Sequence, residues 1–363
     1  MILYENKYKN ILSAPIAGYT NWPLRKLFSQ NCASRIFSEM IHVREVLYKN
    51  DFEIPFLNIN YNFTIQLFGS LADDFIRATE ILFNYCDNVD INCGCPVKKV
   101  IKAEGGSFWL KDIDRFARKI YQLSEYFPHK ISVKIRLGFN KIEIYRILDS
   151  IKNARLAFIT IHMRTSDMFF SGSALYQYAS LLDNYKIPVI LNGDINDAEF
   201  AKQILDNYNC SGIMIGRAAL SDPSIFKKIK DYIEKGQYTI TNKQLKIDFL
   251  IQYIDNLLEY FDLYHNKKIE KFNSKNLNNT NHNFNNNDNC NKKYGEKNFD
   301  DENYLKFIRS NIIESRKILL ALLKKIPGAN NIKDKILKIS NIEDLYNIKK
   351  ILNEFKIIDL QKN

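Results

Sequence analysis

Two thiols that directly follow a short apolar segment are the first residues in this sequence that could do chemistry. Residues 88–96 read NVDINCGCP, so the segment ends at Asn92 and a turn with Cys95 and Pro96 follows. The exit of a strand is where barrels and open α/β sheets place reactive groups. The alternative is a small cysteine that packs in the core. The polar Asn92 and the fixed φ of Pro96 favour an exposed, rigid turn instead.

Small or polar side chains end other apolar segments as well. Residues 15–18 (PIAG) are small enough for a flat ring to lie against the backbone, and Gln66 offers an amide donor or acceptor. Lys134 and Arg136 share one face of a strand, because strand side chains alternate. Two cations on one inward face are costly without an anionic or electron-rich ligand. The alternative for a lone lysine on a strand is a position that faces solvent.

The last three segments end in residues suited to an anion. His162 ends one of them, although a single histidine is more often structural, and residues 192–194 (NGD) end the next. Gly216 can turn its backbone N–H toward an anion, and Arg217 adds a bidentate donor. Loops after strands seven and eight form the usual phosphate site of a (β/α)8 barrel. The set predicts a phosphate-bearing cofactor whose planar ring extends toward Lys134.

A metal centre is not predicted at this position. The pair Cys93 and Cys95 lacks a second Cys or His pair at ligand spacing, and no acidic or histidine cluster competes with it. The six cysteines are scattered along the chain without a disulfide framework, which is typical of free thiols in a reducing cytoplasm. We therefore expect a cytoplasmic protein.

Eight apolar segments position these residues, and each is followed by a stretch of helical periodicity. They span residues 11–16, 35–40, 64–68, 89–92, 131–137, 158–162, 189–192 and 212–215. Strand–helix alternation repeated eight times predicts an α/β fold, a (β/α)8 TIM barrel. A doubly wound sheet also alternates, but it rarely needs eight parallel strands.

The chain changes character after the last of these segments, where only helical patterns remain. We expect a catalytic barrel over residues 1–240 and an all-helical C-terminal domain over residues 241–363. Residues 273–291 contain 11 Asn in 19 positions, which predicts a disordered Asn-rich insertion at about 266–300.

Charge favours a polyanionic partner and gives no sign of a membrane or a protein partner. The net charge is +11, and residues 241–363 hold 22 Lys and Arg against 16 Asp and Glu. The first 240 residues hold 30 against 25, so the basic excess is denser in the last third. An alternative source of this excess is the Lys- and Asn-rich composition itself. No apolar run reaches the length of a membrane span, and the start lacks a signal-peptide layout.

Seven motifs in this order resemble those of tRNA-dihydrouridine synthases, which are flavin-dependent barrel enzymes with a helical tail. The likeness is nearest to the B-type bacterial branch, chiefly from residues 215–226. The motifs are APIAG (14–18), QLFG (66–69), DINCGCP (90–96), VKIRLG (133–138), HMRT (162–165), NGDI (192–195) and GRAAL (216–220). One departure is Met163, since the family usually has glycine after this histidine.

The resemblance assigns roles to the nominated residues. It implies that Cys95 protonates C5 of a flipped uracil, that Asn92 and Arg136 contact this base, and that Lys134 lies near flavin N1 and O2. It further implies tRNA as the substrate, NADPH or NADH as the electron donor, and FMN held by Pro15, Ile16, Ala17, Gln66, Lys134, His162, Asn192, Gly193, Asp194, Gly216 and Arg217.

The implied reaction suits these residue types. Reduction of the uracil C5=C6 bond needs a hydride at C6 and a proton at C5 from the opposite face. The cofactor supplies the hydride, and a thiol with a pKa near ~8.5 keeps its proton at neutral pH. Two alternatives remain open from the sequence. One is a flavin enzyme for free pyrimidines, such as a dihydroorotate dehydrogenase, and the other is an inactive barrel that binds RNA.

Overall fold

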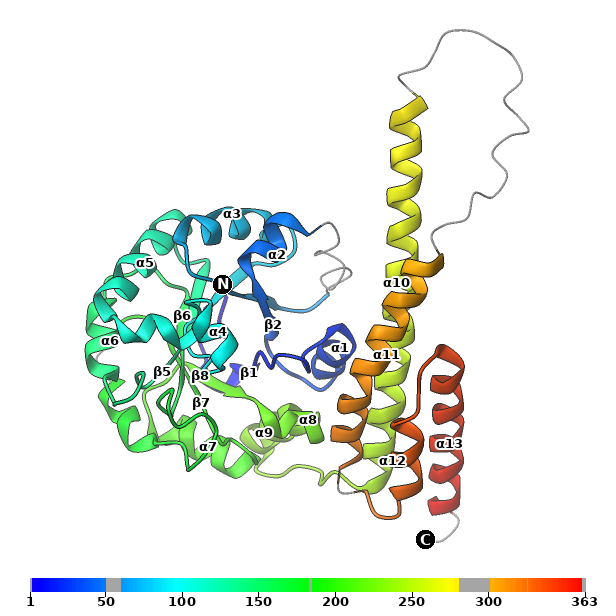
Figure 1. The fold of residues 1–363 in the computed structure, drawn as a ribbon. Coiled ribbons are helices and arrows are strands. Elements are labelled where there is room, and N and C mark those ends of the chain that lie inside the picture. Colours follow the sequence, from blue (N-terminus) through cyan, green and yellow to red (C-terminus); the bar gives the residue numbers. More distant parts are fainter. Residues whose placement is uncertain (1, 50–59, 183–184, 281–300, 325, 361–363) are drawn as a thin grey trace. The chain divides into compact units, whose positions relative to one another are not determined.

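The computed structural model describes residues 2–49, 60–182, 185–280, 301–324 and 326–360. The described chain divides into two compact units, Met1–Asn242 and Lys243–Asn363. The first unit contains all the strands shown in Figure 1, and the second contains helices. Each unit is described by itself below.

The first unit is a barrel of eight parallel strands. Their order is β1-β8-β7-β6-β5-β4-β3-β2, and a parallel bridge between Leu12 and Arg35 joins the two end strands. The strands are β1 (Ile11–Ser13), β2 (Ile36–His42), β3 (Phe63–Phe68), β4 (Asn88–Asn92), β5 (Ile131–Arg136), β6 (Phe158–His162), β7 (Val189–Asn192) and β8 (Gly212–Ile215). The predicted TIM barrel is confirmed, with β1 shorter and β2 slightly longer than expected.

Helices follow the strands around the outside of the barrel (Figure 1). They are α1 (Trp22–Gln30), α2 (Val43–Tyr48), α3 (Ala72–Leu82), α4 (Lys98–Lys102), α5 (Ile113–Tyr126), α6 (Ile144–Ser150), α7 (Ala198–Asn207), α8 (Arg217–Ser221) and α9 (Ile225–Lys235). Short 3-10 helices η1 (Lys7–Lys9), η3 (Gly106–Lys111) and η4 (Tyr176–Leu182) accompany them.

Local sequence explains the regular helices and the one exception. The carboxylate of Asp112 caps α5 by accepting from the N–H of Arg115, and the buried residues Ile113, Phe116 and Ile120 recur at helical spacing. After β6 the expected α-helical stretch is wrong, because the described residues between β6 and β7 form the 3-10 helix η4 and no α-helix. Gly172, with φ of +62°, turns the loop that precedes η4.

The interior of the barrel is apolar on one side and polar on the other. An apolar cluster comes from β1, β2, β6, β7 and β8, and it consists of Leu12, Ala14, Phe37, Phe158, Ile190 and Met214. Strands β3, β4 and β5 instead bury polar side chains, namely Thr64, Gln66, Asn88, Asp90 and Ser132. Buried polar groups must find hydrogen-bond partners, so these strands hold a network instead of a packed core.

The second unit consists of α10 (Lys243–Thr280), α11 (Asp301–Leu323), α12 (Asn330–Ile336) and α13 (Ile342–Leu360). Within the insertion expected at 266–300, α10 continues through Thr280, which corrects that part of the expectation, and residues 281–300 lie outside the described residues. Helix propagation adds one backbone hydrogen bond per residue, and this gain outweighs the weak helix propensity of asparagine. Among the described helices, none is long and apolar enough to cross a membrane.

Candidate active site

A cavity of about 460 Å³ opens at the carboxyl ends of the strands. All the residues that the sequence nominated line it, including Cys95 after β4, Lys134 on β5 and Arg217 after β8. The others are Pro15, Ile16, Ala17, Gln66, Asn92, Arg136, His162, Asn192, Gly193, Asp194 and Gly216. Parallel strands bring their carboxyl ends to one rim, which is why residues 200 positions apart in sequence meet here.

The turn that carries Cys95 is held on both sides. Its N–H donates to the Asn92 side-chain oxygen at 2.9 Å, and its carbonyl accepts from the N–H and the hydroxyl of Ser107, both at 3.0 Å. Burial raises the pKa of the Cys95 thiol, so the sulfur keeps its proton at neutral pH. Cys93 is fully buried and does not line the cavity. Of these two thiols, only Cys95 can meet a ligand in this cavity.

A chain of hydrogen bonds through the side chains of Asp90, Gln66 and Asn92 connects the interior of the barrel to this turn. The Asn92 amide nitrogen donates to Gln66 Oε1 at 2.8 Å, and Gln66 Nε2 donates to Asp90 Oδ2 at 2.7 Å. Asp90 is fully buried, and burial raises its pKa to about 6. Sequence reasoning did not nominate Asp90. The available signal was a carboxylate in the middle of a buried strand, which is rare unless the group has partners.

Lys134 presents a half-buried amine to the cavity. Its Nζ donates to the side-chain oxygen of Asn192 at 3.0 Å, and the Asn192 amide is oriented by a 2.7 Å bond to the carbonyl of Met214. Burial, reinforced by the charge of Arg136, lowers the pKa of Lys134 to about 7. An electron-rich ligand beside this amine would be stabilised by the ammonium form, and it would restore the proton affinity of the amine.

Arg136 has partners that the sequence did not predict. Its guanidinium donates to the main-chain carbonyls of Gly94, Thr165 and Phe169 at 2.7 to 2.8 Å. Burial lowers its pKa to about 10. The Arg136 charge therefore does not require an anionic ligand, because three carbonyl dipoles already stabilise the guanidinium. Arg136 joins the turn after β4 to the loop after β6 while also lining the cavity.

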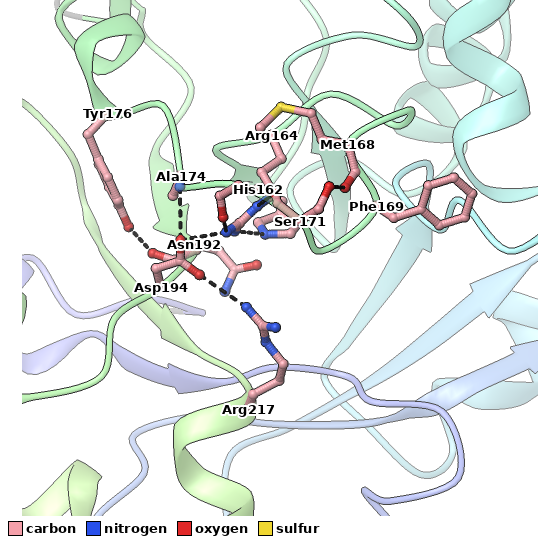
Figure 2. Close-up of polar contacts among 12 residues, drawn as sticks. His162, Arg164, Met168, Phe169, Ser171, Ala174, Tyr176, Asn192, Asp194 and Arg217 are labelled. Carbon is pink, nitrogen blue, oxygen red and sulfur yellow. Dashed lines mark hydrogen bonds and ion pairs between the residues drawn. The ribbon is translucent and has the colours of Figure 1, made fainter.

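An ionic cluster centred on Asp194 lies at the ends of β6, β7 and β8 (Figure 2). One carboxylate oxygen accepts from Arg164 at 2.5 Å and from the N–H of Ala174 at 2.8 Å, and the other accepts from Arg217 at 3.1 Å. Burial alone would raise the pKa of Asp194, but these donors and both guanidinium charges lower it. Asp194 adopts a left-handed backbone with φ of +49°, which aims its carboxylate between the two arginines.

Arg164 is the residue of this cluster that sequence reasoning did not nominate. Its side chain is 1% exposed and also donates to the carbonyls of Ser171 and Gly172. Arg217, by contrast, has a side chain that is 57% exposed. Arg164 therefore fixes the loop after β6 against Asp194, and Arg217 is the cation of the pair that can reach a ligand.

His162 lies beside this cluster as a neutral ring. Burial and the surrounding charges of Lys134, Arg136, Arg164 and Arg217 lower its pKa well below the usual value. Phe170, which sequence reasoning also missed, lies with its ring 6.3 Å from the His162 ring. Met163, the residue after this histidine, is fully buried and lies outside the cavity lining.

Comparison with known proteins identifies the family. The family model described as dihydrouridine synthase matches residues 12–344, which include most of the second unit. The chain belongs to the dihydrouridine synthase family. A probable tRNA-dihydrouridine synthase of Aquifex aeolicus is 30% identical over 263 residues, covering 70% of this chain and 82% of that protein. The tRNA-dihydrouridine synthase B of Pasteurella multocida is 30% identical over 262 residues, covering 69% and 78%.

Solved structures were also found that are similar to the barrel of this chain. An old yellow enzyme homologue from Zymomonas mobilis has a TM-score of 0.48 at 12% identity, covering 64% of this chain and 90% of that chain. The family match decides between the readings left open by the sequence, because it identifies an enzyme of uridine reduction and not a dehydrogenase of free pyrimidines or an idle barrel.

Proposed function

We propose that this dihydrouridine synthase reduces specific uridines of tRNA to 5,6-dihydrouridine, with FMN as the cofactor and NADPH or NADH as the electron donor. The observation that carries the proposal is one cavity lined by a protonated thiol, a half-buried amine and an exposed arginine. The relatives described above carry the tRNA-dihydrouridine synthase name, and the basic excess of residues 241–363 agrees with a tRNA substrate.

The residues present fit FMN. The cavity volume lies in the range of cofactor sites, and a Cβ added at Gly216 would meet nothing nearer than Ala14 at 3.8 Å, which leaves room beside this backbone. Arg217 and Gly216 would hold the phosphate, and residues 15–17 would lie against the ring. Lys134 would hold the N1 and O2 edge, where a cation favours the electron-rich form. His162, neutral and buried, would pack or accept a hydrogen bond without adding charge.

Each residue around the base has a defined task in this proposal. Bound flavin supplies the hydride for C6 of uracil. The Cys95 thiol donates its proton to C5 from the opposite face, which is possible because its raised pKa keeps it protonated. Arg136 and Asn92 line the cavity and would contact the base, and both are also bonded to protein groups. A uridine inside folded tRNA must be flipped out to reach this cavity, at a cost of a few kcal/mol.

The second unit is the proposed tRNA contact. A surface hollow in this unit is lined by three lysines and two acidic residues, namely Lys335, Lys338, Lys350, Asp344 and Glu354, and the lysines can pair with backbone phosphates. Such contacts carry little sequence information, so they would orient the tRNA, and the barrel would select the flipped base.

The test uses the purified full chain. We expect a yellow protein whose flavin is bleached by NADPH and regains its colour when tRNA from a strain lacking this gene is added. Dihydrouridine should then appear in that tRNA by mass spectrometry. Free uracil and orotate serve as matched substrates, and faster flavin reoxidation by either of them than by tRNA would overturn the proposal.

A further inference from the structure

Asp90 is a buried carboxylate to which neither cofactor binding nor proton donation assigns a task. It occupies the middle of β4 with no exposed surface. Its Oδ1 accepts from the hydroxyl of Ser132 at 2.6 Å, and its Oδ2 accepts from Gln66 at 2.7 Å. A buried charge of this kind costs free energy, so its retention in the barrel interior calls for a role that a neutral packing residue does not supply.

The carboxylate determines which way the neighbouring amides point. An ionised carboxylate only accepts hydrogen bonds, so Gln66 must turn its NH₂ group toward Asp90. The Gln66 oxygen then faces Asn92 and accepts from the Asn92 NH₂ at 2.8 Å. This leaves the Asn92 oxygen to accept from the N–H groups of Gly94 at 3.1 Å and Cys95 at 2.9 Å. Flipping either amide would place two donors or two acceptors face to face.

The chain of hydrogen bonds that begins at Asp90 therefore ends at the backbone N–H of Cys95. The carbonyl of Cys95 is held independently by Ser107, whose hydroxyl also bonds to Ser166 at 2.5 Å. With its carbonyl fixed from one side, the remaining freedom of the turn is limited by the N–H bond to Asn92. Loss of that acceptor would release the Cys95 thiol from its partly buried position.

We propose that Asp90 is a positioning residue for Cys95: its acceptor-only carboxylate sets the direction of the Gln66–Asn92 relay, which holds the thiol in place. The inference rests on the proposed function, because it takes Cys95 as the proton donor. It adds a residue that touches neither substrate nor cofactor and acts through two amides.

Three variants separate positioning from plain support of the barrel. Asp90→Ala removes the acceptor for Gln66 and frees both amides to turn. Asp90→Asn is the rescue variant, because its oxygen accepts from Gln66 while its NH₂ donates to Ser132. Ser132→Ala is the matched control: it removes the other buried hydrogen bond of the same carboxylate but leaves the relay to Cys95 intact.

The first readout is alkylation of Cys95 by iodoacetamide in the FMN-loaded full chain without tRNA, followed by peptide mass spectrometry. We expect Asp90→Ala to be alkylated about tenfold faster, because the released turn exposes the thiol, and Asp90→Asn and Ser132→Ala to stay within about threefold of wild type. Equal acceleration in Asp90→Ala and Ser132→Ala, or no acceleration in Asp90→Ala, would overturn the proposal.

The second readout is single-turnover reoxidation of the reduced enzyme by tRNA. A misplaced donor should slow this half-reaction in Asp90→Ala by about 10-fold to 100-fold. If wild-type enzyme is not reoxidised by tRNA, the proposed function fails, whereas the alkylation comparison still decides the positioning role. If Asp90→Ala does not fold, Gln66→Met decides, since it breaks the relay and leaves the Asp90–Ser132 bond. Wild-type alkylation in Gln66→Met would refute the inference.

Discussion

Two aspartates of the same barrel have their pKa values shifted in opposite directions. Asp90, inside β4, is bonded only to neutral donors, and burial raises its pKa to about 6. Asp194, after β7, lies between Arg164 and Arg217, and its pKa is lowered. The difference shows that one side of the cavity directs hydrogen bonds through neutral groups, whereas the other concentrates positive charge. We infer that the first side serves the proton and the second serves the cofactor phosphate.

Removing the Cys95 thiol, on the side of the cavity that serves the proton, should have the largest effect on activity. In Cys95→Ala we expect reoxidation of the reduced flavin by tRNA to fall about 10²–10⁴-fold, because the general acid is lost. FMN binding and reduction by NADPH should remain, since neither step involves the thiol. Stopped-flow absorbance measures both half-reactions. Cys93→Ala is the control, because this thiol is buried outside the cavity, and equal defects in the two variants would contradict the assignment of the proton to Cys95.

Neutralising the arginine on the other side should affect phosphate binding and not proton transfer. In Arg217→Gln we expect FMN affinity to fall about tenfold, the loss typical of one charge-assisted hydrogen bond. Riboflavin, which lacks the phosphate, should bind with unchanged affinity, as measured by fluorescence titration. Arg146→Gln is the matched control, because Arg146 is an exposed arginine paired on the barrel surface. A parallel loss for both flavins would show that Arg217 does not contact the phosphate.

The opposite pKa shifts predict opposite effects of pH on stability. Asp90 binds its proton more tightly in the folded chain, so its ionisation removes stability as pH rises from about 4 to about 6. Asp90→Asn should therefore raise the unfolding free energy at pH 7.5 by about 1–3 kcal/mol. Asp194 has a lowered pKa in the folded chain. Its contribution to the unfolding free energy is therefore present above about pH 4, and it is lost as the pH falls through the pKa of Asp194 in the folded chain.

Urea unfolding of Asp90→Asn and Asp194→Asn at pH 4 and pH 7.5 tests the direction of each change in unfolding free energy. We expect Asp194→Asn to destabilise the protein at pH 7.5, because two arginines lose their counter-charge. A change in unfolding free energy in the same direction for the two variants at pH 7.5 would show that the surroundings of the two carboxylates do not have opposite effects on stability.

Changes in the second unit should leave both sides of the cavity intact and give the smallest effect. In Lys338→Glu we expect a several-fold loss of tRNA affinity that is reduced by added salt, with FMN affinity unchanged. Filter binding at several salt concentrations measures it. Arg316 is unsuitable for this test, because its guanidinium donates to the carbonyl of Ile339 and supports the unit itself. Unchanged affinity across Lys335, Lys338 and Lys350 reversals would remove this hollow from the tRNA contact.

The sequence was sufficient for the barrel because the signal was repeated and local. Each strand is a short apolar run next to turn residues, and all eight were located to within a few residues. After β6 the described residues form the 3-10 helix η4 where an α-helix was expected, and the sequence pattern there did not distinguish the two. Likewise, the end of α10 could not be read from composition, because helix propagation depends on backbone bonds that asparagine weakens only slightly.

By itself, the sequence determined the order of the strands and most of the polar residues that line the cavity, because each nominated residue lies near the carboxyl end of a strand or directly after it, and parallel strands share one rim. Only the tertiary structure decided what those residues bond to. Asp90, Arg164 and Phe170 were missed, and the carbonyl partners of Arg136 were not predicted, because hydrogen bonds between strands and loops depend on register and direction. The protonation state of a charged side chain depends on the hydrogen-bond donors and acceptors that the fold brings within about 3 Å of it.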